Sequence, residues 1–185
     1  QNTVTSRFMS MRQMNLAWTG GSTPAWAGPG VVLRYEGVSN VGFGYGPPVS
    51  TPTVMLATMQ RVGPTWAVVK WQSYLNGQLN GERYSLASAA VPSGGVFLPQ
   101  AVLAALKAGQ VLDTDPITGV TVSVAQTPLN IGGRQLLVLV HEGQSFRRLY
   151  GYDRQSGMLI YYLSSSQEGV SQFGTEVQLT GVSGR

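Results

Sequence analysis

The stretch that decides the fold runs over residues 53–75, TVMLATMQRVGPTWAVVKWQSYL. It reads as two strands, 53–62 and 65–75, joined at Gly63-Pro64 because these two residues favour a turn. Successive side chains of a strand point to opposite faces, so Trp66 and Lys70 share one face of the second strand and Trp71 lies on the other. Neither face is wholly apolar, which predicts a sheet that is covered only in part.

Short apolar segments between turn formers continue on both sides of this stretch. We expect further strands at residues 31–37, 82–90, 110–113, 120–127, 134–141, 146–152, 158–165 and 175–182. Residues 39–52 are rich in Gly and Pro, and we expect them to form a long loop that exposes Phe43 and Tyr45. The pattern predicts a mainly β protein: a curved antiparallel sheet, an open barrel or a sandwich of about ten strands.

One segment, residues 99–108, has the features of a short helix. Pro99 suits a first helical turn, Lys107 favours the negative C-terminal end, and Gly109 can adopt the left-handed conformation that ends a helix. We expect this helix to pack on the sheet as a plug or a lid. At this length, residues 30–185 are expected to form a single β-rich domain.

The N-terminal segment, residues 1–29, fits no regular period, and we expect it to be irregular or extended and able to pair with a neighbouring copy. Large aromatic residues lie in segments that we expect to be irregular. They are Phe8, Trp18, Trp26, Phe43 and Tyr45. Such residues fold back as core plugs, form contacts between molecules or stack on sugars. We treat these five as candidate interface residues.

Two turns in the last third of the chain share one pattern. Asp115 and Asp153 begin them, a hydroxyl residue follows at the fourth position, and Gly119 and Gly157 close them. The Asp side chain can accept hydrogen bonds from the backbone of its own turn, and Gly can take the left-handed position that returns the chain. We therefore predict two structural hairpin turns.

The sequence around the second of these turns is similar to a hairpin of other proteins. Its sequence, Tyr152-Asp153-x-x-Ser-Gly157-Met-Leu, resembles a hairpin that is common in exported β-rich domains, including half-barrel lipid carriers. The resemblance covers less than a tenth of the chain, and what it implies is the fold class.

The composition limits the partners and the compartment. Charged residues make up 11% of the chain, against about 25% in ordinary soluble proteins, which favours a secreted or cell-envelope protein. The net charge of +4 comes from ten Arg and two Lys, and Arg147-Arg148 is the one adjacent basic pair, so no nucleic acid partner is expected. No apolar run reaches the ~20 residues of a membrane-spanning helix.

The sequence offers no catalytic or metal-binding constellation. Cysteine is absent, which excludes disulfides and thiolate metal sites. His141, the one histidine, precedes Glu142, but neighbours in a strand point to opposite faces. No Ser lies in a Gly-x-Ser-x-Gly elbow, and Asp113-x-Asp115 lacks the further oxygen ligands of a calcium loop. We expect a protein that is not an enzyme and that has neither cofactor nor metal.

Two functions remain. In the first, the chain is a non-enzymatic structural or interaction subunit of an extracellular or cell-envelope assembly, with copies of itself or another envelope protein as partner. In the alternative, it is an exported barrel-like carrier of an apolar ligand such as a lipid. The first predicts loop aromatics buried between copies, and the second predicts an internal cavity of several hundred Å³.

Overall fold

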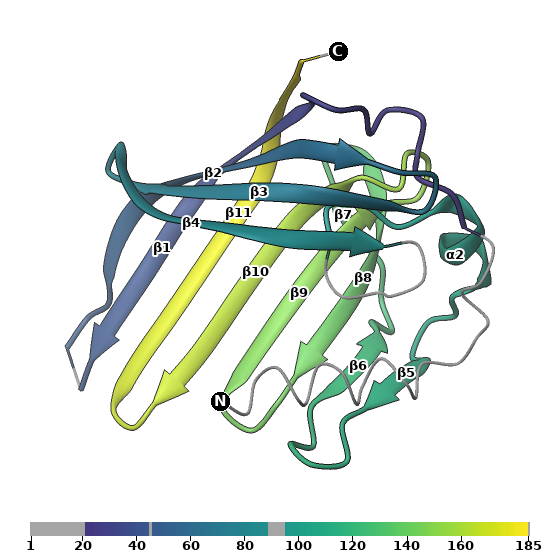
Figure 1. Ribbon diagram of the computed structural model, residues 1–185. Coiled ribbons are helices and arrows are strands. Elements are labelled where there is room, and N and C mark those ends of the chain that lie inside the picture. Colours follow the sequence, from purple (N-terminus) through teal and green to yellow (C-terminus); the bar gives the residue numbers. More distant parts are fainter. Residues whose placement is uncertain (1–20, 45, 89–94, 185) are drawn as a thin grey trace.

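The computed structural model describes residues 21–44, 46–88 and 95–184, and it shows one curved antiparallel sheet (Figure 1). Eleven strands are present in the described residues, in the order β4-β3-β2-β1-β11-β10-β9-β8-β6-β5, with β7 pairing β8 beside this path. The strands β4 and β5 at the two ends of this order do not pair with each other, so the sheet is open. The predicted mainly β, antiparallel fold with one short helix is confirmed.

The first four strands pair as neighbours. The helix then comes between β4 at one end of the strand order and β5 at the other end. The strands are β1 (Val32–Phe43), β2 (Val49–Val62), β3 (Trp66–Leu75), β4 (Gln78–Ser88), β5 (Val111–Thr114), β6 (Thr121–Val124), β7 (Leu129–Ile131), β8 (Arg134–Glu142), β9 (Phe146–Asp153), β10 (Leu159–Glu168) and β11 (Ser171–Ser183). The last strand, β11, returns to pair with β1 and so joins the two halves of the sheet.

The expected long loop at 39–52 is wrong. The strand β1 continues to Phe43 and β2 begins at Val49, so only a short connection remains between them. The Gly and Pro content misleads because β1 is paired on both sides: Val41 faces Val49 of β2 and Phe173 of β11. Pairing on both sides overrides a weak local preference for strand.

The helix is shorter than the predicted 99–108. It is α2 (Gln100–Ala105), with Pro99 as the residue before its first turn. Leu106 leaves the helix in an extended conformation, φ −80° and ψ 134°, and is buried in the core. Lys107 and Gly109 therefore lie outside the helix. With six residues α2 is far from the length needed to cross a membrane, and no other described helix reaches it.

The apolar core lies against one face of the sheet, which we call the inner face. This face carries Leu33, Tyr35, Val69, Trp71 and Tyr152, all buried. We call the end of the inner face beside α2 and the β9–β10 turn the apolar end (Figure 1). Residues 96–98 and the buried side of α2 close the core there. We call the opposite end, formed by the β1–β2, β8–β9 and β10–β11 turns, the distal end.

Candidate functional site

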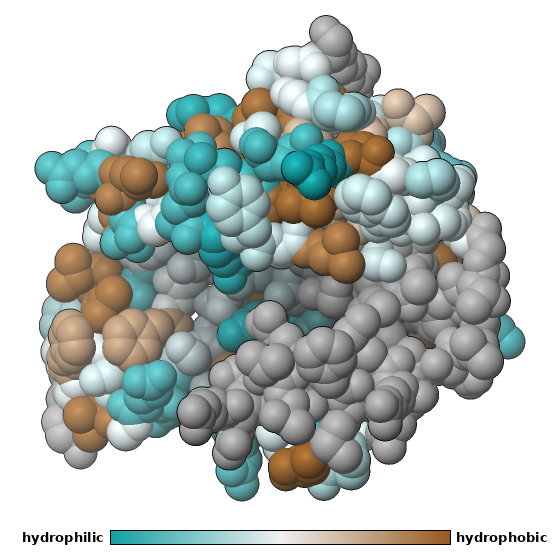
Figure 2. Space-filling view, in the orientation of Figure 1, coloured by the Kyte–Doolittle hydropathy of each residue, from teal (hydrophilic) through white to brown (hydrophobic). Residues whose placement is uncertain are grey.

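Between the two ends, the inner face borders a partly open cavity of about 360 Å³, which we call the inner cavity. Its lining comes from six strands: Ser39 (β1); Thr53 and Met55 (β2); Trp71, Gln72, Ser73 and Leu75 (β3); Asn80, Gly81, Glu82 and Arg83 (β4); Tyr162 and Ser164 (β10); and Thr175 (β11). Figure 2 shows the molecule hollowed below strands β2–β4, with hydrophilic and hydrophobic side chains at the rim.

The strand register explains why these side chains converge. Residues that face each other across an antiparallel pair point to the same side of the sheet. Met55 faces Ser73, which faces Gly81, and this row crosses β2, β3 and β4. Ser164 of β10 faces Thr175 of β11 in the same way. Rows from strands distant in the sequence thus meet on the inner face.

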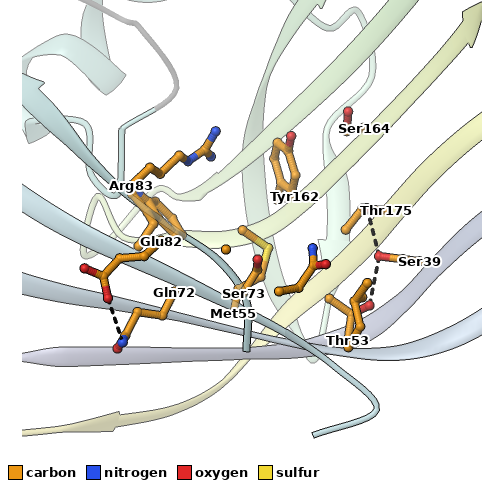
Figure 3. Close-up of a pocket in the computed structure, with 14 residues that line it drawn as sticks. Ser39, Thr53, Met55, Gln72, Ser73, Glu82, Arg83, Tyr162, Ser164 and Thr175 are labelled. Atoms are coloured by element: carbon orange, nitrogen blue, oxygen red, sulfur yellow. Dashed lines mark hydrogen bonds between the residues drawn. The ribbon is translucent and has the colours of Figure 1, made fainter. Parts of the chain in front are cut away.

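Hydroxyl groups form one wall of the cavity. Thr53 Oγ1 donates a hydrogen bond to Ser39 Oγ at 2.8 Å, and Ser39 Oγ lies 3.0 Å from Thr175 Oγ1 (Figure 3). This hydroxyl cluster joins β2, β1 and β11. A row of short polar side chains on the buried face of a sheet leaves space that larger apolar residues would fill, and its oxygen atoms can hydrogen-bond a polar ligand group.

Aromatic and apolar side chains lie on the strands that flank this cluster, β3 and β10. Trp71 stands next to Tyr35, with ring centroids 6.0 Å apart, and its Nε1 donates to Ser85 Oγ at 2.9 Å. Tyr162 stacks at 5.2 Å on Tyr150, its partner across β9 and β10. Because the indole and the phenol rings are held by these contacts, they offer a fixed apolar surface beside the hydroxyl cluster.

Positive charge reaches the same region from both sides. The Arg83 guanidinium lies 5.9 Å from the Trp71 ring centroid, and that of Arg148 lies 4.9 Å from the Phe146 ring. Burial raises the pKa of Tyr150 to about 12; neighbouring Tyr162 adds to the rise, and the charges of Arg148 and Arg83 oppose it. The two guanidinium groups therefore both act on the same phenol.

The carboxylate nearest in sequence to Arg83 is engaged elsewhere. Glu82 accepts from Lys70 Nζ at 2.8 Å and from Gln72 Nε2 at 3.1 Å, and Figure 3 shows its carboxylate turned toward Gln72 and away from Arg83. The hydrogen bond between Lys70 and Glu82 lowers the pKa of Glu82 and raises that of Lys70. This pair is a feature of the outer face.

A second depression, of about 560 Å³, lies near the distal end. Its lining includes Gly143, Ser165 and Gly174, from the tips of the β8–β9 and β10–β11 hairpins and the strands beside them. Arg147 and Ser165, which line it, stand next in sequence to residues of the inner face and so point to the outer face. We take the inner cavity as the candidate site because its lining joins converging hydroxyl, aromatic and cationic side chains.

The aromatic residues that we singled out in the sequence have different surroundings. Trp26 is half-buried at the apolar end, where its Nε1 donates to the Ser156 carbonyl at 2.8 Å and its ring meets Phe97 edge-on. Phe43 is exposed at the distal end. Phe8, Trp18 and Tyr45 lie outside the described residues, as does the expected pairing of residues 1–20 with a neighbour.

The two Asp-Gly turns have the same backbone hydrogen bonds. Gly119 N donates to the Asp115 carbonyl, and Gly157 N donates to the Asp153 carbonyl, each at 2.8 Å. The Asp115 carboxylate accepts from the backbone N–H of Ile117 at 2.9 Å, which lowers its pKa. The Asp153 carboxylate accepts from the Ser156 hydroxyl at 2.6 Å. Neither turn contributes to the inner cavity.

The histidine and its acidic neighbour lie on opposite faces. The His141 ring is 4.8 Å from that of Tyr150 on the inner face, whereas Glu142 lies 4.0 Å from Arg147 on the outer face. Within the described part of the chain, no three His, Asp or Glu residues come together as metal ligands would. His141 and Glu142 therefore do not form an acid–base pair.

The residues that line the inner cavity could not be identified from the sequence. Trp71, Ser73 and Leu75 alternate along β3, and Gly81 and Arg83 do so along β4, but alternation alone does not say which strands face each other. No protein-family model and no curated protein sequence matches the chain.

Proposed function

We propose that the protein is a non-enzymatic binding protein that holds a small amphiphilic molecule in the inner cavity. The observation that carries this proposal is the lining: one partly open cavity is lined by a hydroxyl cluster and by Trp71, Met55 and Tyr162. Its volume of about 360 Å³ is within the range of small-molecule sites, about 300–1,000 Å³. A ligand with one apolar and one polar part matches both walls.

The proposal carries over two expectations from the sequence. The low charge of the chain, 11%, and its turn resemblance to exported β-rich domains support a secreted or envelope location. A carrier needs no catalytic group, which agrees with the separation of His141 from Glu142 across the sheet. The apolar carrier expected from the sequence becomes a carrier of amphiphiles, because the hydroxyl cluster offers oxygen atoms that a polar ligand group can hydrogen-bond.

The test compares two serines that are next to each other in β10. Ser164 lines the inner cavity and Ser165 lies on the outer face. We expect an uncharged fluorescent probe, phenylnaphthylamine, to bind the wild-type protein saturably, and Ser164→Phe to weaken this binding by about ten-fold or more because the phenyl ring fills the cavity. Ser165→Phe, the matched control, should bind as the wild type does.

Probe titration and thermal unfolding of all three proteins check this expectation. The absence of saturable binding to the folded wild type would contradict the proposed function. Equal weakening in both variants would move the binding site away from the inner cavity.

A second candidate, a subunit of an assembly, is favoured by the edge strand β4. It ends the strand order and pairs only with β3 among the described residues. Leu79, Tyr84 and Leu86 on this strand are exposed, at 56%, 61% and 56%. An unpaired edge with apolar side chains is a template for strand addition by another chain.

Light scattering behind size exclusion at several protein concentrations tests the second candidate. If β4 joins copies, particles larger than 19.7 kDa should persist on dilution, and Tyr84→Lys combined with Leu86→Lys should dissociate them. Val111→Lys is the control, since Val111 is similarly exposed on the other edge strand, β5. A monomer at every concentration would exclude self-assembly through this edge.

A further inference from the structure

Arginine side chains lie in and beside the inner cavity, and no described Asp or Glu forms an ion pair with either of them. Arg83 lines the cavity from β4. Arg148 stands on β9 directly across from Ser164, which also lines it. The strands β4 and β9 are far apart in the sheet order, so it is the curvature of the sheet that brings both arginines to one region.

The eight acidic residues of the chain all lie in the described part, and none lies within ion-pair distance of Arg83 or Arg148. Three of them pair with other basic groups: Glu36 with Arg34, Glu82 with Lys70 and Glu142 with Arg147. The remainder are committed to turns, hydrogen bonds or strand ends: Asp113, Asp115, Asp153, Glu168 and Glu176. Arg34, Lys70 and Arg147 thus have acidic partners, which Arg83 and Arg148 lack.

Aromatic rings hold the two guanidinium groups in place. The guanidinium of Arg83 packs over Trp71 and that of Arg148 over Phe146, and both arginines remain exposed to solvent. Arg148 also opposes the rise in the pKa of Tyr150 that burial causes. Both guanidinium charges act on Tyr150, and two positive charges in one region favour an anion there.

We infer that the inner cavity recognises an anionic head group of its amphiphile, with Arg83 and Arg148 as the two cationic contacts. The inference rests on the proposed function and specifies the ligand class. Arginine donates several N–H groups in a planar fork that matches both carboxylate and phosphate oxygens. The hydroxyl cluster of Ser39, Thr53 and Thr175 lies on the neighbouring wall, and the alkyl part lies along Met55, Trp71 and Leu75.

Three probes with the same twelve-carbon chain separate head group from tail: dodecanoate, dodecyl phosphate and dodecyl maltoside. Each is titrated calorimetrically into the full-length protein below its micelle concentration. We expect the anionic probes to bind more tightly than the maltoside, and Arg83→Gln and Arg148→Gln each to weaken the anionic probes by about ten-fold or more. Binding of the maltoside should change by less than about two-fold, since it makes no ionic contact.

Arg147→Gln is the matched control. It removes the same charge from the next residue of β9, but on the outer face beside Glu142. Equal losses in Arg147→Gln and Arg148→Gln would show that only the net charge matters and would overturn the inference. A comparison of dodecanoate with dodecyl phosphate then identifies the head group as a carboxylate or a phosphate.

The outcomes separate this inference from the function on which it rests. If the maltoside binds as tightly as the anionic probes and neither arginine matters, the anion site is refuted while the proposed function stands. If none of the three probes binds, both fail. If circular dichroism shows that an arginine variant is misfolded, the salt dependence of wild-type binding is the deciding measurement. Added NaCl must then weaken the binding of the anionic probes and leave that of the maltoside unchanged.

Discussion

The two ends of the inner face carry aromatic pairs of almost identical geometry in opposite environments. At the apolar end, Trp26 and Phe97 meet edge to face with ring centroids 6.4 Å apart at 83°. At the distal end, Phe43 and Phe173 meet at 6.5 Å and 87°. Phe97 is 1% exposed, whereas Phe43 is 66% exposed. The ring geometry is the same, so any difference in contribution to stability comes from burial.

This difference in burial separates the part of the inner face that stabilises the fold from the part that borders the cavity. The apolar end is filled by Phe97, Leu98 and the buried side of α2, which belong to the apolar core. In the region beyond the apolar end, hydroxyl groups and arginines take the place of large apolar residues on the inner face. The inner cavity is the space that remains there. We therefore expect substitutions at the apolar end to change stability and substitutions at the cavity to change binding.

The largest expected effect is that of Phe97→Ala. Removal of a fully buried phenylalanine costs about 3–5 kcal/mol of unfolding free energy. The matched substitution, Phe43→Ala, removes a ring with the same edge-to-face contact but little burial, and we expect a loss of about 0.5–1.5 kcal/mol at most. Denaturant unfolding of both variants measures the difference, and equal losses would show that burial does not distinguish the two ends.

The sequence was sufficient for features that are local. Each Asp-Gly turn depends on five consecutive residues, so Asp115 with Gly119 and Asp153 with Gly157 could be read directly. The different surroundings of the two turns could not be predicted from the sequence. A Cβ on Gly119 would meet nothing within 4 Å, but one on Gly157 would lie 2.1 Å from the Leu98 carbonyl oxygen, because residues 96–98 pack on that turn alone.

Longer-range features escaped prediction for a related reason. The continuation of β1 to Phe43 depends on β11, more than a hundred residues later in the chain. The approach of Arg83 and Arg148 to Tyr150 depends on the strand order and the curvature of the whole sheet. Periodicity shows which residues of one strand share a face, but it carries no information on which strands are neighbours.

A smaller effect that separates the two ends is expected in alkali. Burial raises the pKa of Tyr152 well above its ordinary value, with smaller contributions from Tyr150 and Tyr35, and burial likewise raises that of Tyr35. An unfolded tyrosine loses its proton above about pH 10. The folded state retains it, so the stabilisation is complete below pH 10 and is lost as the pH rises toward the folded pKa.

Tyr152→Phe tests this at one site. At neutral pH we expect a loss of about 0.5–1.5 kcal/mol, because the variant lacks the hydrogen bond that Tyr152 Oη donates to the Gly95 carbonyl at 2.8 Å. Above pH 10 the wild type should lose stability by up to about 1.4 kcal/mol per pH unit more than the variant. Urea unfolding from pH 7 to 11 measures both slopes, with Tyr84→Phe on the exposed face of β4 as the control that should follow the wild type. Parallel curves for Tyr152→Phe and the wild type would mean that the apolar end admits hydroxide without unfolding, which is incompatible with a closed core at that end.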